Sequence, residues 1–180
     1  MAQRSNGRRA AIVDGLRTPF AKQGTVYRNL SALDLARMVT AELIARLDIP
    51  PDFIEQVVYG QVIPSVEMHN IAREIVLSTE MPPQTDAYSV SRACATSYQT
   101  TINVMRAIED GEIDCGLAGG TESTSVAPVT VTRKLQQSLL EASQADSIME
   151  SARAFAGLRP GDLIPQRSTL EEPSTGETMG

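Results

Sequence analysis

The sequence predicts an α/β fold in which a mostly parallel sheet carries helices on its faces. Between residues 10 and 120, short runs rich in β-branched residues alternate with segments of helical periodicity. Strands separated by helices form parallel sheets, because each crossover returns the chain in the same direction. Aromatic residues make up only 4% of the chain and Trp is absent, which favours closely packed helix-on-sheet layers. With 180 residues, 42% of them hydrophobic, the chain is long enough to bury a core.

Four short segments are predicted to be strands. Gln56–Ile63 alternates in polarity and is rich in Val and Ile, and Pro64 ends it. The other three are apolar runs that meet a glycine or a polar turn, namely Ala10–Asp14, Ala87–Ser91 and Asp114–Ala118. Residues 16–30 contain Pro and Gly among mixed polarity, so we expect a loop there.

The first two helices are predicted from their capping residues. Ser31 and Asp34 form a capping-box pattern, and an apolar stripe with helical spacing follows until Pro50. Asn70 is a suitable N-cap for a second helix that continues through Ser78.

Two further helices follow in the second half of the chain. Helical spacing resumes near Cys94 and continues to about Glu109, and Gly111 is a typical C-terminal cap. After Gly120 the pattern changes, and residues 131–156 form a single long helical candidate.

Charge and composition exclude several classes of protein. The formal net charge of −6 argues against nucleic acid as the main partner, because phosphate contacts dominate that affinity. The N-terminus carries Arg4, Arg8 and Arg9 without an apolar run, so it is not a secretory signal. No stretch approaches the roughly 18 apolar residues of a membrane span. We therefore expect a cytoplasmic or organelle-matrix protein with reduced thiols.

The most informative candidate for chemistry is Cys94. A short buried strand leads into Ser91, the cysteine follows, and a helix begins. Unpaired N–H groups and the positive end of the helix dipole favour a thiolate there, and the same groups can hold an oxyanion. The alternative is a buried structural cysteine, and spacing alone ranks that alternative ahead of catalysis.

The remaining candidates are weaker. Cys115 lies in an apolar run, so we interpret it as a core residue. His69 directly precedes a predicted N-cap and is interpreted as a surface or capping-region histidine rather than a base. The acidic residues between 109 and 114 are typical of a solvated turn. Neither a metal-ligand cluster nor a phosphate-binding glycine fingerprint is present, so we expect no metal and no permanently bound cofactor.

Several motifs occur in an order that resembles the thiolase family, the acetyl-CoA C-acyltransferases of fatty-acid β-oxidation. They are AIVDGLRTPFAKQ, VVYGQVI, HNIAREIVL, SVSRACATSYQT and AGGTESTS, and the closing STGETMG resembles the start of a further motif. The resemblance covers positions 11 to 180, which is less than half of a typical family chain. It implies a thiolase-like N-terminal half plus part of an inserted loop domain. The implied division is a tail over 1–9, a core over 10–123 and a partial loop domain over 124–180, with the long helix at 131–156.

The resemblance also implies a chemistry. Cys94 would attack a 3-ketoacyl-CoA, hold the shortened acyl group as a thioester and transfer it to CoA, which is a co-substrate, while the backbone N–H of Cys94 would help to hold the oxyanion. Family members also need a general-base His and a second acid/base Cys in the C-terminal half. Neither His69 nor Cys115 is at a matching position, so we expect the chain alone to be inactive.

The resemblance suggests partners as well. Three segments, SRACATS, RKLQQSLLEA and STGETMG, are most similar to the thiolase (β) subunit of the multifunctional β-oxidation complex, which implies an α subunit. A homo-oligomer or a poorly soluble chain is expected on a separate ground: without a second half to cover them, apolar residues such as Ile102, Met105 and Ile108 are left partly exposed. The loop domain of that group is associated with membranes, but the near-balanced charge of residues 131–156 weakens an argument for anionic lipid.

Two other functions stay open from the sequence. A ketoacyl-synthase-type condensing enzyme also places a Cys at a helix N-terminus, although GLRTPF and AGGTES favour thiolase. A non-catalytic half-fold that serves as an interaction or dimerisation module is the other alternative.

Overall fold

The computed structural model describes residues 7–65, 68–167 and 174–177. The chain divides into two compact units, one ending at Ala127 and the other beginning at Pro128. The first unit therefore includes the short 3₁₀ helix Thr124–Val126, which follows the predicted core boundary at 123. It is held there because Ser125 Oγ accepts the Gly24 N–H at 2.9 Å and the Thr124 carbonyl accepts the Gln23 side-chain amide at 2.8 Å.

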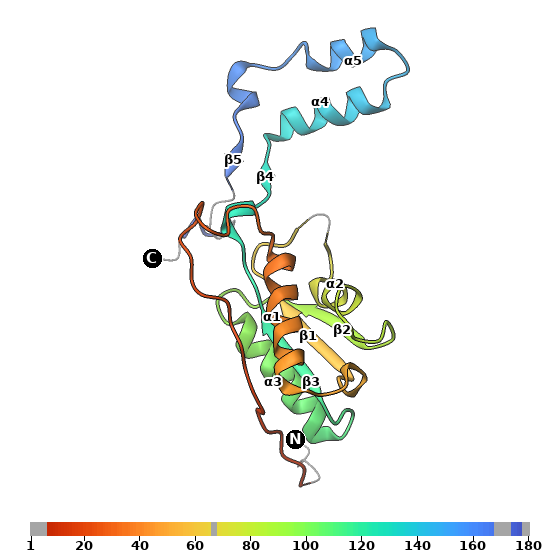
Figure 1. Cartoon of the computed structure of the whole chain (residues 1–180). Coiled ribbons are helices and arrows are strands. Elements are labelled where there is room, and N and C mark those ends of the chain that lie inside the picture. Colours follow the sequence, from red (N-terminus) through yellow and green to blue (C-terminus); the bar gives the residue numbers. More distant parts are fainter. Residues whose placement is uncertain (1–6, 66–67, 168–173, 178–180) are drawn as a thin grey trace. The chain divides into compact units, whose positions relative to one another are not determined.

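The first unit is built on a three-stranded parallel sheet. Its strands are β1 (Gln56–Gly60), β2 (Asp86–Val90) and β3 (Gly116–Gly120), in the spatial order β2-β1-β3. Gly60 lies opposite Val90 on one side and opposite Gly120 on the other, so the three strands end level with one another. The predicted parallel α/β fold is confirmed, and all three carboxyl ends meet at one edge of the sheet (Figure 1).

Three helices belong to this unit: α1 (Ala32–Leu47), α2 (Ile71–Leu77) and α3 (Thr96–Asp110). The predicted capping box begins α1, because the Ser31 hydroxyl accepts the Asp34 N–H at 3.1 Å and Asp34 accepts the Ser31 N–H at 2.9 Å. The Asn70 side chain caps α2 as predicted. Gly111 ends α3 with φ 78°, a left-handed conformation that suits glycine. A 3₁₀ turn, Pro51–Phe53, precedes β1.

The two faces of the sheet are covered by different helices. Val57, Tyr59 and Leu117 belong to the main core cluster together with buried residues of α1 and α2. The intervening positions face α3 and are small on β3. A Cβ on Gly116 would lie 2.7 Å from Val104 Cγ1, and one on Gly120 would lie 2.4 Å from Ser97 Oγ. The absence of these side chains lets α3 pack closely on the sheet, which gives three layers.

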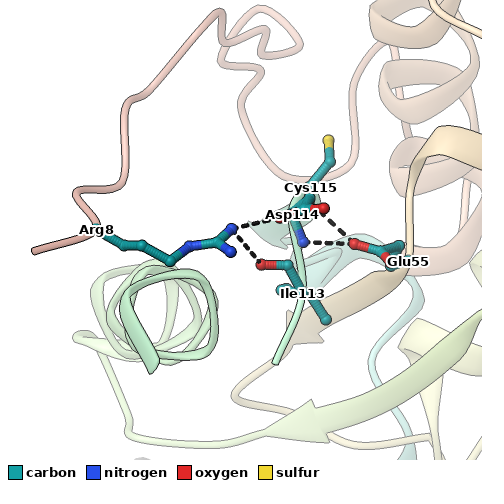
Figure 2. Close-up of polar contacts among 5 residues, drawn as sticks. All are labelled: Arg8, Glu55, Ile113, Asp114 and Cys115. Atoms are coloured by element: carbon teal, nitrogen blue, oxygen red, sulfur yellow. Dashed lines mark hydrogen bonds and ion pairs between the residues drawn. The ribbon is translucent and has the colours of Figure 1, made fainter. Parts of the chain in front are cut away.

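The predicted strand Ala10–Asp14 is absent from the structure. The segment makes no strand pairing among the described residues, and Ile12 and Val13 are 79% and 84% exposed. A strand requires a neighbouring strand for its backbone hydrogen bonds, and in the described sheet β2 and β3 pair only with β1. The segment is instead anchored before its apolar run, where Arg8 forms an ion pair with Asp114 and donates to the Ile113 carbonyl (Figure 2).

Two carboxylates set strand ends that the sequence placed differently. β3 begins at Gly116 rather than Asp114, because Glu55 accepts the N–H groups of Asp114 and Cys115 (Figure 2). β1 ends at Gly60 rather than Ile63, because Glu122 accepts the N–H groups that follow. In each case a carboxylate accepts the backbone N–H groups that a neighbouring strand would otherwise bind.

The second unit contains a two-stranded antiparallel ribbon and a pair of helices. The ribbon is β4 (Val129–Thr130) with β5 (Gln166–Arg167), and the helices are α4 (Arg133–Gln144) and α5 (Ile148–Phe155), followed by a 3₁₀ turn at Pro160–Leu163.

Two helices thus replace the single helix predicted over 131–156. Ala145 is extended, with φ −73° and ψ 135°, and the Ser147 hydroxyl caps α5 by accepting the Glu150 N–H at 3.3 Å. Ser and Asp side chains compete with helical hydrogen bonds, so the segment between α4 and α5 favours a break and a new cap over a continuous helix.

Candidate active site

A cavity of about 210 Å³ lies at the carboxyl ends of the strands. Its lining comes from the residues that follow β1, from the turn before α3 and the first turn of that helix, and from the residues that follow β3. In detail these are Gly60, Gln61, Val62, Ala93, Cys94, Thr96, Ser97, Gly120, Thr121 and Glu122. This is the edge at which open parallel α/β sheets generally bind ligands.

Cys94 lines this cavity and is exposed. It directly precedes Ala95, the N-cap residue of α3, so the thiol lies at a helix N-terminus as the sequence predicts. Ala95 provides no side-chain cap. The first N–H groups of a helix lack intrahelical partners and carry partial positive charge, which can stabilise an oxyanion in this place.

The turn before α3 is sharp. Ala93 has φ 44°, a left-handed conformation that a residue with a Cβ rarely adopts. The Thr96 hydroxyl accepts the Arg92 N–H at 2.8 Å and donates to the Ala93 carbonyl at 2.7 Å. The turn therefore presents Cys94 in a fixed conformation between β2 and α3.

Gly60 allows this turn to pack against β1. A Cβ at this position would lie 2.1 Å from the Val90 carbonyl oxygen and 2.3 Å from Thr96 Cγ2. No side chain fits there, and the glycine in the middle of VVYGQVI is the sequence signal for such a close approach.

The opposite wall of the cavity is held by Glu122. Its carboxylate accepts the Val62 N–H at 2.7 Å and the Ile63 N–H at 3.2 Å, and the Thr121 N–H donates to the Gly60 carbonyl at 3.0 Å. Gln61 lies on this wall, and its side-chain oxygen is buried without a hydrogen-bond partner among the described residues. The sequence does not single out Glu122, Gln61 or Thr96, because their roles depend on contacts distant in sequence or on a turn geometry.

The other sequence candidates lie away from this cavity. Cys115 precedes β3 at the far end of that strand and is half-buried against the core, which agrees with the predicted structural role. Burial raises the pKa of its thiol, and the neighbouring Glu55 carboxylate raises that pKa further. His69 is exposed and directly precedes Asn70, the N-cap of α2. Neither residue lines the cavity with Cys94.

The acidic residues near β3 form no metal site. Asp114 is paired with Arg8, and within the described ranges no group of three or more His, Cys, Asp or Glu side chains is placed to hold a metal ion. Among the described residues no helix is long and apolar enough to cross a membrane.

The first unit is thus a parallel α/β layer with an exposed cysteine at the entry of a helix, in a cavity at the carboxyl edge of the sheet. Residues 10–160 match the family model for the thiolase N-terminal domain, so the chain belongs to the thiolase family. It is 51% identical over 174 residues to 3-ketoacyl-CoA thiolases from Erwinia tasmaniensis and Klebsiella pneumoniae. These alignments cover 97% of this chain but 40% of each relative.

Solved structures agree with the family. A thiolase from Ascaris suum in complex with coenzyme A superimposes with a TM-score of 0.63 at 35% identity, over 66% of this chain and 31% of that chain. The acetyl-CoA acetyltransferase of Bacillus anthracis superimposes with a TM-score of 0.67 at 25% identity, over 69% of this chain and 32% of that chain. The predicted thiolase-like N-terminal fold is confirmed.

Proposed function

We propose that this chain supplies the nucleophile of a 3-ketoacyl-CoA thiolase, and that the nucleophile is Cys94. The observation that carries this proposal is the exposed Cys94 thiol at the N-terminus of α3, on the cavity at the carboxyl ends of the strands. The relatives that match nearly the whole chain are named 3-ketoacyl-CoA thiolase, which gives the reaction class. The reaction would belong to fatty-acid breakdown.

The proposed chemistry has two acyl transfers. The Cys94 thiolate attacks the 3-keto carbon, the bond between C2 and C3 breaks, and its electron pair leaves as the enolate of acetyl-CoA, which takes up a proton. The shortened acyl group stays on Cys94 as a thioester. A second CoA thiolate then attacks the thioester carbonyl and releases the shortened acyl-CoA and the Cys94 thiolate. A thiolate suits both steps, because it is a good nucleophile and a good leaving group.

The residues around the thiol support these steps. Negative charge develops on the carbonyl oxygen during both attacks, and N–H groups at a helix N-terminus stabilise such charge. The N–H groups of Ala95 and Thr96 already donate to the carbonyls of Arg92 and Ala93 at 3.0 and 3.2 Å. On the family resemblance, we assign the Cys94 N–H as a backbone donor to the oxyanion.

The volume of the cavity supports binding of only the reacting end of the substrate. Sites that enclose a drug-sized ligand usually measure about 300–1,000 Å³, and this one has about 210 Å³. It holds the thioester and keto groups, while the remainder of CoA binds elsewhere. The Ascaris suum neighbour was solved with coenzyme A, which is consistent with CoA as the co-substrate here.

The 180 residues alone are expected to turn over poorly. The family resemblance assigns the general base and the second cysteine to the segment beyond the 40% of the relatives that this chain spans. General acid–base groups contribute roughly 100- to 10,000-fold each, so a chain without both keeps little activity. Partners follow from the same resemblance: a second copy of the chain, and the α subunit of a β-oxidation complex.

The test is thiolysis by the complete enzyme, in which this chain is joined to the remaining segment of a relative. Consumption of a 3-ketoacyl-CoA with CoA is measured for the wild type, for Cys94→Ser and for Cys115→Ser. We expect Cys94→Ser to abolish turnover, because Ser is a much weaker nucleophile without its own activating base. Cys115→Ser should retain it. Robust turnover by Cys94→Ser would contradict the proposal, and an inactive wild type would favour a non-catalytic module.

A further inference from the structure

The side chain of Thr96 forms two hydrogen bonds with the turn that carries Cys94. Thr96 is the first residue of α3 and is only 5% exposed. Its hydroxyl accepts the Arg92 N–H at 2.8 Å and donates to the Ala93 carbonyl at 2.7 Å. A single hydroxyl thus connects both residues before Cys94 to the first turn of the helix.

The conformation of Ala93 requires such a restraint. Its φ of 44° lies in the left-handed region, which is disfavoured for every residue that carries a Cβ. Residues persist in such conformations where the surrounding structure holds them. The Ala93 carbonyl receives both the Thr96 hydroxyl at 2.7 Å and the Thr96 N–H at 3.2 Å. Thr96 therefore provides two of the hydrogen bonds that keep the turn in place.

The position of the hydroxyl is fixed from the other side by β1. The Thr96 methyl group packs so closely on Gly60 that a Cβ there would lie 2.3 Å from it. In a β-branched side chain the methyl and the hydroxyl share one rotatable bond, so a fixed methyl also fixes the hydroxyl. The glycine, the methyl group and the hydroxyl together leave one arrangement of the turn.

We propose that Thr96 is a positioning residue for Cys94, which fixes the direction in which the thiol is presented to the cavity. This inference rests on the proposed role of Cys94 as the nucleophile. Thr96→Val replaces the hydroxyl with a methyl group of similar size, and Thr96→Ser keeps the hydroxyl and serves as the matched control. The loss of one or two net hydrogen bonds corresponds to about a tenfold change in the equilibrium between the held and the released turn.

The first experiment measures alkylation of both cysteines in the 180-residue chain by peptide mapping. In Thr96→Val, Cys94 should be labelled roughly three- to tenfold more slowly, because the released turn presents the thiol at the cavity for only a fraction of the time. Thr96→Ser should stay closer to the wild type than Thr96→Val does, because it keeps the hydroxyl although it lacks the methyl group that packs on Gly60. Cys115 should be unchanged in all three, since its burial reports folding. Equal labelling rates of Cys94 in the wild type and in Thr96→Val would overturn the inference. So would a Cys94 labelling rate in Thr96→Ser as low as that in Thr96→Val.

The second experiment uses the wild type alone. It therefore tests the inference even if Thr96→Val unfolds, which faster labelling of Cys115 would reveal. Amide hydrogen exchange at Arg92 reports the bond to the Thr96 hydroxyl directly. We expect exchange at least about tenfold slower than for a free amide. Exchange at the free rate would overturn the inference. Both readouts are independent of acyl transfer, so a failure of the proposed function would appear in the thiolysis assay and leave these results unaffected.

Discussion

Replacement of Gly60 by Ala tests the close packing on which the site depends. Gly60 ends β1, is buried, and lies opposite both Val90 and Gly120 in the sheet. The new Cβ would lie 2.1 Å from the Val90 carbonyl oxygen and 2.3 Å from Thr96 Cγ2. Cβ contacts under 3.0 Å are essentially never found, so β2 or α3 has to move away from β1 by about 1 Å.

The loss in the free energy of unfolding expected for Gly60→Ala depends on the groups that the new Cβ displaces. A backbone carbonyl within a parallel sheet is not a flexible side-chain end, and the Thr96 methyl belongs to the buried first turn of α3. Overpacking of a close-packed interior costs typically 1–3 kcal/mol and occasionally more, so we expect a loss of about 3 kcal/mol in the free energy of unfolding. For a domain of this size that loss lowers Tm by roughly 10 °C.

The assay is urea and thermal unfolding of the 180-residue chain, with Gly15→Ala as the matched control. A Cβ on Gly15 meets nothing within 4 Å, and its φ is not in the left-handed region, so that variant should stay within about 0.5 kcal/mol of the wild type. A loss below about 1 kcal/mol in Gly60→Ala, or an equal loss in both variants, would refute the close approach of the Cys94 turn to β1.

Three further predictions concern groups with defined surroundings. Cys94 should be alkylated faster than Cys115, because Cys94 is exposed while burial and Glu55 raise the pKa of the Cys115 thiol; faster labelling of Cys115 in peptide maps would contradict this. Burial raises the pKa of Tyr59 from 10.0 to about 12. The buried neutral phenol therefore contributes its full stabilisation below pH 10, and this stabilisation is lost as the pH rises towards 12. Absorbance titration measures the pKa of the phenol, and a value near 10.0 would count against the burial of Tyr59. Hydrogen bonds from the Ser31 side chain and backbone lower the pKa of Asp34, so the cap of α1 stabilises the fold above pH 3.8 and this stabilisation is lost as the pH falls further. Ser31→Ala should lower the free energy of unfolding by about 1 kcal/mol at neutral pH. An unchanged free energy of unfolding would contradict the capping box.

The exposed face of α3 bears on the assembly of the protein. Tyr98 is 76% exposed, and Ile102 and Met105 are each 37% exposed, on the helix that begins at the candidate site. Apolar groups gathered on one helix indicate an interaction surface or an aggregation hazard. Light scattering of the isolated chain tests the predicted oligomer, and a stable monomer would contradict that prediction.

The sequence was sufficient for features that depend on local chemistry. The capping box at Ser31, the N-cap Asn70 and the C-terminal Gly111 act within one helical turn, so their residue types alone locate the helix ends. The alternation of strand and helix likewise predicted the parallel sheet and the place of Cys94 before α3.

The sequence did not predict features that depend on a contact with a residue far along the chain. Residues 10–14 have the composition of a strand, but a strand also needs a free edge beside it, and composition does not report that edge. The carboxylates of Glu55 and Glu122 set the ends of β3 and β1 across about 60 residues of chain. The role of Thr96 depends on the left-handed conformation of Ala93. The sequence does not predict that conformation, because alanine rarely adopts it.

The mass of the acyl-enzyme is the most direct test of whether Cys94 carries the acyl group. The complete enzyme is incubated with a 3-ketoacyl-CoA without free CoA, quenched in acid and digested. We expect one acyl adduct, on the peptide that contains Cys94, which disappears when CoA is added and is absent from Cys94→Ser. An adduct on Cys115, or an adduct that persists in Cys94→Ser, would contradict the assignment.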